Sequence, residues 1–284
     1  MKETPQKNRT IMSIVAIAIG LLMIALIPFL IQTSLSRVLE NITRVVAEGE
    51  TKFRSGIKLF DLFFPAWRAI IFVAGTTLIV ISGSIRRGEE WTFPLAMSMF
   101  SLPSIGGFFM FLPYVSFVKN SFPLPMAISF IGLAGYWAFI FLRKADRATK
   151  WAFFAALTFI GMLATHAFTI GIGAQRQMMV RPNYPFYDDF KMWLFLWTGE
   201  VNWVATILLV ISIPLLAVSK KRGWWLAVIG ASTILVLDAF TYIFRNTTND
   251  FLYGALLAIG VLFFTVVPYF KSKLLGEASR LGEE

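Results

Sequence analysis

The chain has no cysteine, one histidine and few charged residues, and each shortage excludes a class of protein. Without cysteine there can be no disulfide framework, thiolate metal site or cysteine nucleophile. One histidine cannot supply two axial haem ligands. Walker, Rossmann and HExxH motifs are also missing, so we expect no cofactor. Charged residues make up 15% of the 284 positions, which is low for the surface of a soluble protein.

Apolar residues are abundant instead, at 57% of the chain with a mean hydropathy of +0.70. A soluble fold of this length could not bury so much apolar surface, so the expected solvent is lipid. An α-helix needs about 20 apolar residues to cross about 30 Å of hydrocarbon. We therefore predict an all-α, polytopic integral membrane protein that forms one transmembrane domain over residues 1–284, with about eight transmembrane helices. The predicted spans are 11–33, 67–85, 91–117, 123–142, 151–173, 192–218, 224–244 and 251–270.

The net charge of +10 is explained better by membrane topology than by nucleic-acid binding. Lysine and arginine lie in short clusters between the apolar runs, for example at 143–150 and 220–222, and not along one face. When the N-terminus is placed in the cytoplasm, the dense clusters fall on the cytoplasmic side. We therefore predict that both termini are cytoplasmic and that nucleic acid is not a partner.

Residues 34–66 form an outer amphipathic segment between the first two spans. Leu35, Val38 and Ile42 recur at helical spacing, with charged residues at the positions between them. The segment either prolongs the first transmembrane helix or lies on the outer leaflet, and Pro28 offers a place for a kink. A simple interfacial helix and a docking surface for other membrane subunits both fit the pattern.

A second outer segment, AQRQMMVRPNYPFYDDFK at 174–191, combines two prolines, three aromatic residues and charges of both signs. It could be a lid with an anion-binding edge, and an ordered connecting loop fits equally well. Its charged candidate residues are Arg176, Arg181, Asp188 and Asp189.

Three consecutive spans each place one ionisable group at a similar depth. Counted from the outer helix ends at about 1.5 Å per residue, His166, Glu200 and Asp238 all lie roughly 10 Å below the surface. A charge near the bilayer centre costs on the order of 3 kcal/mol, so these side chains should face the bundle interior. Sequence neighbours in a bundle are usually spatial neighbours, so we expect the three groups to converge. Asn202 and Tyr242 lie close by in sequence and are added to this site.

The third span contributes two further candidates, Ser101 and Ser104. Pro103, followed by Gly106 and Gly107, should break or kink the helix near the midplane of the bilayer. Interrupted helices whose freed backbone groups line a cavity form binding sites in transporters. Because proline and glycine are common in transmembrane helices, a purely structural role is the alternative.

An imidazole beside carboxylates suits proton relay at neutral pH. A hydrogen-bonded cluster that joins helices is the alternative, and no ligand spacing indicates a metal site. We therefore favour a multi-pass transporter or channel for a small solute or ion, with proton coupling through the His/Glu/Asp cluster. No repeat relates the two halves of the chain, which weakens this hypothesis. An accessory subunit of a larger membrane complex and a membrane-embedded enzyme acting on a lipid or lipid-linked substrate stay open.

Overall fold

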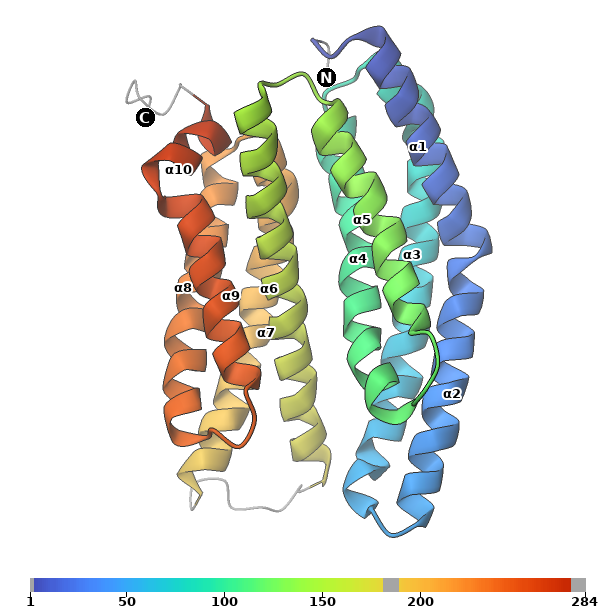
Figure 1. Cartoon of the computed structure of the whole chain (residues 1–284), viewed down its shortest axis with the longest axis vertical. Coiled ribbons are helices and arrows are strands. Elements are labelled where there is room, and N and C mark those ends of the chain that lie inside the picture. Colours follow the sequence, from blue (N-terminus) through green and yellow to red (C-terminus); the bar gives the residue numbers. More distant parts are fainter. Residues whose placement is uncertain (1–2, 181–188, 277–284) are drawn as a thin grey trace. The chain divides into compact units, whose positions relative to one another are not determined.

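The computed structural model describes residues 3–180 and 189–276, and every regular element in these ranges is a helix. The predicted all-α class is therefore confirmed. The chain divides into two compact units, residues 1–144 and residues 145–284, and each is described by itself (Figure 1). The prediction of a single domain stays a prediction.

Unit 1 is a bundle of long helices in which α1 packs on α3 and α4 packs on α5. Small residues allow the closest approaches, since a Cβ atom on Gly20 would stand 2.7 Å from the backbone oxygen of Gly75. The elements of unit 1 are α1 (Gln6–Ala25), α2 (Ile27–Ala47), the 3-10 turn η1 (Thr51–Phe53), α3 (Arg54–Arg87), α4 (Thr92–Phe117) and α5 (Leu124–Leu142).

The amphipathic segment prolongs the first helix, which is one of the two arrangements expected from the sequence. A single residue, Leu26, separates α1 from α2, and Pro28 lies in the first turn of α2. Leu35, Val38 and Ile42 are buried along one face, as their spacing predicts, and α2 packs against α3.

The remainder of the 34–66 segment belongs largely to α3, which begins well before the predicted start at residue 67. Leu59 and Phe64 are buried while Lys58 and Asp61 are exposed. Charges on one face lower the average hydropathy of this part of the helix, and the predicted boundary followed that average rather than the helical pattern.

Of the break or kink predicted in the third span, the break does not occur, because α4 is continuous through Pro103. A Cβ atom on Gly106 would stand 2.6 Å from the ring of Trp67 on α3, and one on Gly107 would stand 2.6 Å from the backbone nitrogen of Ser129 on α5. The two glycines therefore allow close helix packing instead of opening a gap. A helix can retain its course at a proline when neighbouring helices hold it in place.

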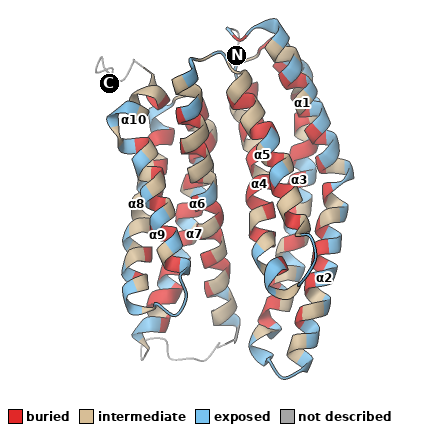
Figure 2. Cartoon of the chain, in the orientation of Figure 1, coloured by how far each residue is buried: buried red, intermediate tan, exposed pale blue. Residues whose placement is uncertain are grey.

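Unit 2 is a four-helix bundle with a short fifth helix at its C-terminal end. Each of α6, α7, α8 and α9 packs on the next, and α9 packs back on α6. The elements are α6 (Arg147–Val180), α7 (Phe190–Ala217), α8 (Lys221–Phe244), α9 (Asp250–Val266) and α10 (Pro268–Leu275). Figure 2 shows the buried residues as stripes along these helices.

The last predicted span, 251–270, differs from the structure at its end. The axis bends by 68° between α9 and α10. Pro268 explains the bend, because the residue before a proline is driven out of the helical region and Val267 has a φ of −56° and a ψ of 126°.

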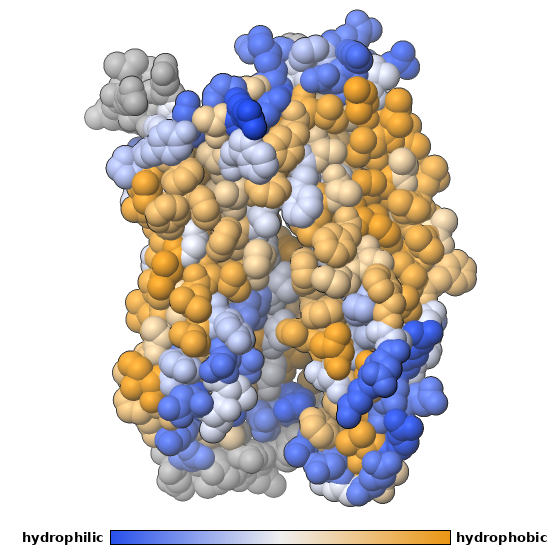
Figure 3. Space-filling model, viewed as in Figure 1, coloured by the Kyte–Doolittle hydropathy of each residue, from blue (hydrophilic) through white to orange (hydrophobic). Residues whose placement is uncertain are grey.

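Seven helices in the described ranges, with α1 and α2 counted together, are long and apolar enough to cross a membrane. The number rises to eight if the bent pair α9–α10 is one span. On the face drawn in Figure 3, apolar residues cover the middle of each unit and hydrophilic residues gather towards the helix ends. The fold is compatible with an integral multi-pass membrane protein, and the orientation of the termini stays a prediction.

Candidate functional site

A buried carboxylate links two helices in unit 2. Asp238 on α8 has no exposed surface, and Asn202 on α7 is also buried. The Nδ2 of Asn202 donates a hydrogen bond of 3.1 Å to Oδ1 of Asp238. The same nitrogen donates to the backbone oxygen of Thr198 at 2.9 Å, which fixes the orientation of the amide. The structure thus brings together two of the residues predicted from the sequence.

Threonines extend this polar contact along the α7–α8 interface. The hydroxyls of Thr198 and Thr241 are 2.7 Å apart, and the hydroxyl of Thr206 donates to the backbone oxygen of Asn202 at 2.8 Å. Residues 198, 202 and 206 are spaced by four, so they share one face of α7. The sequence therefore builds a polar stripe on α7 that faces the side of α8 carrying Asp238.

His166 on α6 approaches the same carboxylate, and Gly254 on α9 leaves the space for both groups. A Cβ atom on Gly254 would overlap Oδ2 of Asp238 and would stand 3.0 Å from Nε2 of His166. Both side-chain atoms thus lie within 3.0 Å of one point on the surface of α9. Three helices, α6, α8 and α9, meet at this point, and no residue larger than glycine fits there without movement.

Asp250 lies in the first turn of α9, the helix that carries Gly254. The carboxylate of Asp250 is close enough for its charge to act on the imidazole of His166. Asp250 is exposed, His166 is half-buried and Asp238 is fully buried. Titratable groups therefore extend from the end of the bundle towards its interior.

Three polar atoms in this cluster are buried and have no hydrogen-bond partner within the described chain: Oδ2 of Asp238, Oδ1 of Asn202 and Nε2 of His166. A buried polar atom left without a partner costs about 1–3 kcal/mol. Such atoms occur at few places in a folded protein and require an explanation. A proton, a water molecule or a small cation between the carboxylate and the imidazole would satisfy them.

Glu200 does not join the cluster, and the expected convergence of three ionisable groups is corrected in this respect. Its side chain is exposed, while Thr198 and Asn202 on either side of it are buried. Residues two apart on a helix point in nearly opposite directions, so a polar stripe through 198 and 202 turns position 200 outward.

Tyr242 and the two serines make other contacts. Tyr242 packs against an apolar cluster that includes Phe195 and Phe251. Ser101 and Ser104 belong to unit 1, where their hydroxyls donate to the backbone oxygens of Ser98 and Phe100, respectively. These bonds satisfy the hydroxyls within α4 itself.

The predicted outer loop lies only partly within the described residues. Arg181 and Asp188 fall outside them. Arg176 is half-buried near the C-terminal end of α6. Asp189 caps α7 by accepting a hydrogen bond of 3.1 Å from the backbone nitrogen of Met192, a local role that an aspartate before a helix often has.

Sequence reasoning missed Gly254 and Asp250. A glycine in an apolar helix carries no chemical signal, although it does indicate close approach by a neighbouring group. Asp250 lies one residue before the last predicted span, 251–270. In the described ranges, no three His, Asp or Glu side chains come together in a way that could hold a metal ion.

Comparison with known proteins identifies no relative of the chain. No family model matches the chain, and no match was found among curated proteins or solved structures.

Proposed function

We propose that the chain is a multi-pass membrane transporter or channel for a small solute or ion, with both termini in the cytoplasm. In this proposal the cluster of Asp238, Asn202 and His166 takes up and releases a proton. The observation that supports it is the approach of a buried carboxylate and an imidazole to one point, each with an unpartnered atom.

The exposures suggest a direction for the proton. In this proposal a proton enters from the end of the bundle where Asp250 is exposed, and the half-buried imidazole of His166 accepts it. Nε2 then passes a proton through a bridging water molecule to Oδ2 of Asp238, which becomes a neutral carboxylic acid while the ring returns to its uncharged form. Neutralisation removes the cost of a buried negative charge, so the change is favourable inside an apolar bundle. Asn202 holds the other carboxylate oxygen throughout.

The test is proton movement in liposomes that contain the full-length protein. A pH gradient is imposed with potassium and valinomycin present, and an enclosed pH dye reports its decay. We expect the wild-type protein to speed the decay, and Asp238→Asn and His166→Ala each to return it to the rate of protein-free vesicles. Glu200→Gln is the matched control, because it removes an exposed carboxylate from the same bundle and should leave the rate unchanged.

The proposal fails if the wild-type protein gives no faster decay than empty vesicles, or if Asp238→Asn retains the full rate while folding normally. Loss of the rate in Glu200→Gln as well would indicate a general effect of charge. The accessory-subunit alternative makes a different prediction, namely that purification in mild detergent retains a partner protein.

A further inference from the structure

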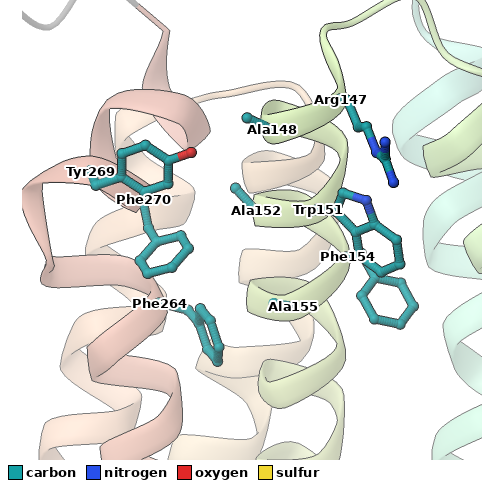
Figure 4. A pocket seen from close by; sticks show the side chains of 9 residues that line it. All are labelled: Arg147, Ala148, Trp151, Ala152, Phe154, Ala155, Phe264, Tyr269 and Phe270. Atoms are coloured by element: carbon teal, nitrogen blue, oxygen red, sulfur yellow. The ribbon is translucent and has the colours of Figure 1, made fainter.

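A groove lies along α6 at the end of unit 2 where α6 begins and α9 bends into α10 (Figure 4). Its volume is about 690 Å³, within the range of roughly 300–1,000 Å³ found for small-ligand sites. Ala148, Ala152 and Ala155 form its floor. Their spacing of four and three places them on one face of α6, so the floor is a smooth strip of methyl groups.

Aromatic side chains stand on both sides of this floor. Trp151 and Phe154 come from α6, and Phe264, Tyr269 and Phe270 come from α9 and α10 (Figure 4). The rings support one another, with Phe264 and Phe270 packed edge-to-face at 5.0 Å between centroids. The bend before α10 is therefore what positions the second wall of the groove.

The edge of the groove is polar and positively charged. Trp151 and Tyr269 are 49% and 56% exposed, and rings with a polar tip are typical of the headgroup level of a membrane. Arg147 is exposed and forms no salt bridge within the described residues. The carboxylate of the adjacent Asp146 accepts hydrogen bonds from Thr149 and lies 3.8 Å from the Lys273 ammonium, and it forms no salt bridge with Arg147 within the described residues.

We propose that this groove binds an anionic phospholipid, with one acyl chain along the alanine floor and the phosphate beside Arg147. The apolar floor and walls suit a hydrocarbon chain better than a soluble anion. The free guanidinium at the edge complements a negative headgroup and forms bidentate bonds with phosphate oxygens. The inference needs the chain to lie in a membrane, but it does not depend on proton movement through Asp238.

The experiment is native mass spectrometry of the full-length protein, titrated in detergent with dioleoylphosphatidylglycerol or with the zwitterionic dioleoylphosphatidylcholine. We expect the anionic lipid to bind more tightly to the wild-type protein. Arg147→Gln should weaken its binding about fivefold, the factor expected for one basic residue at a lipid headgroup. Ala148→Leu should weaken the binding of both lipids, because the larger side chain narrows the groove at its floor.

Arg222→Gln is the matched control. Arg222 is an exposed arginine in the first turn of α8, and it does not line the groove. Unchanged anionic-lipid binding in this variant, together with loss in Arg147→Gln, supports the proposal. Equal binding of the two lipids to the wild-type protein, or equal losses in the two arginine variants, overturns it. Full lipid binding in Ala148→Leu also overturns the proposal, since the lipid would then not occupy the groove. A protein dimer that Ala148→Leu dissociates overturns it as well, since a second copy of the chain would then fill the groove.

Discussion

Replacement of Gly254 by alanine is the sharpest perturbation that the cluster offers. The added methyl group would overlap Oδ2 of Asp238 and stand 3.0 Å from both the Cγ of that residue and Nε2 of His166. The carboxylate cannot turn away freely, because its other oxygen is held by Asn202. The methyl group can therefore be accommodated only if the carboxylate moves or α9 shifts away from α8.

The expected loss of stability follows from three contributions. Alanine is favoured over glycine in a helix by about 1 kcal/mol. Overpacking in a close-packed interior costs about 1–3 kcal/mol. Displacement of the carboxylate from Asn202 adds about 1.5–3 kcal/mol, since the bond involves a charged acceptor. We expect Gly254→Ala to lower the free energy of unfolding by about 1.5–5 kcal/mol. The apparent Tm should fall by roughly 3–20 °C.

Thermal unfolding in detergent, followed by circular dichroism, measures this change. Gly161→Ala is the control, because Gly161 lies in α6 and a Cβ atom there would meet no other atom within 4 Å. This substitution should leave the apparent Tm unchanged or raise it slightly. A similar fall in both variants would show that the effect is not specific to the cluster.

A double variant isolates the proposed contact. In the Asp238→Ala background the overlapping carboxylate is absent, so the further change Gly254→Ala should cost little. The coupling between the two substitutions should exceed about 1 kcal/mol, as expected for residues in direct contact. If Gly254→Ala lowers the apparent Tm equally in both backgrounds, the carboxylate of Asp238 does not lie against Gly254 as described.

Two further predictions concern helix packing and a helix cap. Gly107→Ala should destabilise the α4–α5 contact by about 1–3 kcal/mol, because its Cβ would press on the backbone of Pro125 and Ser129. Gly83→Ala is the control in the same melting assay, since the nearest atom to a Cβ at Gly83 is 3.5 Å away. Hydrogen bonds from the Thr149 hydroxyl and backbone N–H lower the pKa of Asp146 in the folded protein. The ionised carboxylate therefore stabilises the fold at pH values above the pKa of Asp146 in the unfolded chain. This stabilisation is lost as the pH falls through the pKa of Asp146 in the folded protein. Asp146→Ala should lower the apparent Tm at pH 7 and have little effect at pH 2, and an equal effect at both values would contradict this assignment.

The apolar runs were sufficient to predict the helices, because each run had to satisfy its backbone hydrogen bonds internally. They were less informative about where a helix begins or turns. The exposed charges of Lys58 and Asp61 concealed the first turns of α3, and Pro268 ended α9 within a run that hydropathy alone treats as continuous. Hydropathy reports the average character of a window, whereas a helix boundary depends on individual residues.

The depth of a residue in the membrane was a useful guide to the candidate site, but it did not determine which way the side chain points. Asp238 and Glu200 lie at similar distances from the helix ends, so depth favoured both equally. The structure buries Asp238 and exposes Glu200. The deciding information was the four-residue spacing of Thr198, Asn202 and Thr206, because the period of 3.6 residues turns that stripe towards α8 and position 200 away from it. A carboxylate in an apolar helix is therefore assigned to a site more safely by the polar residues three and four positions away than by its neighbours at one and two.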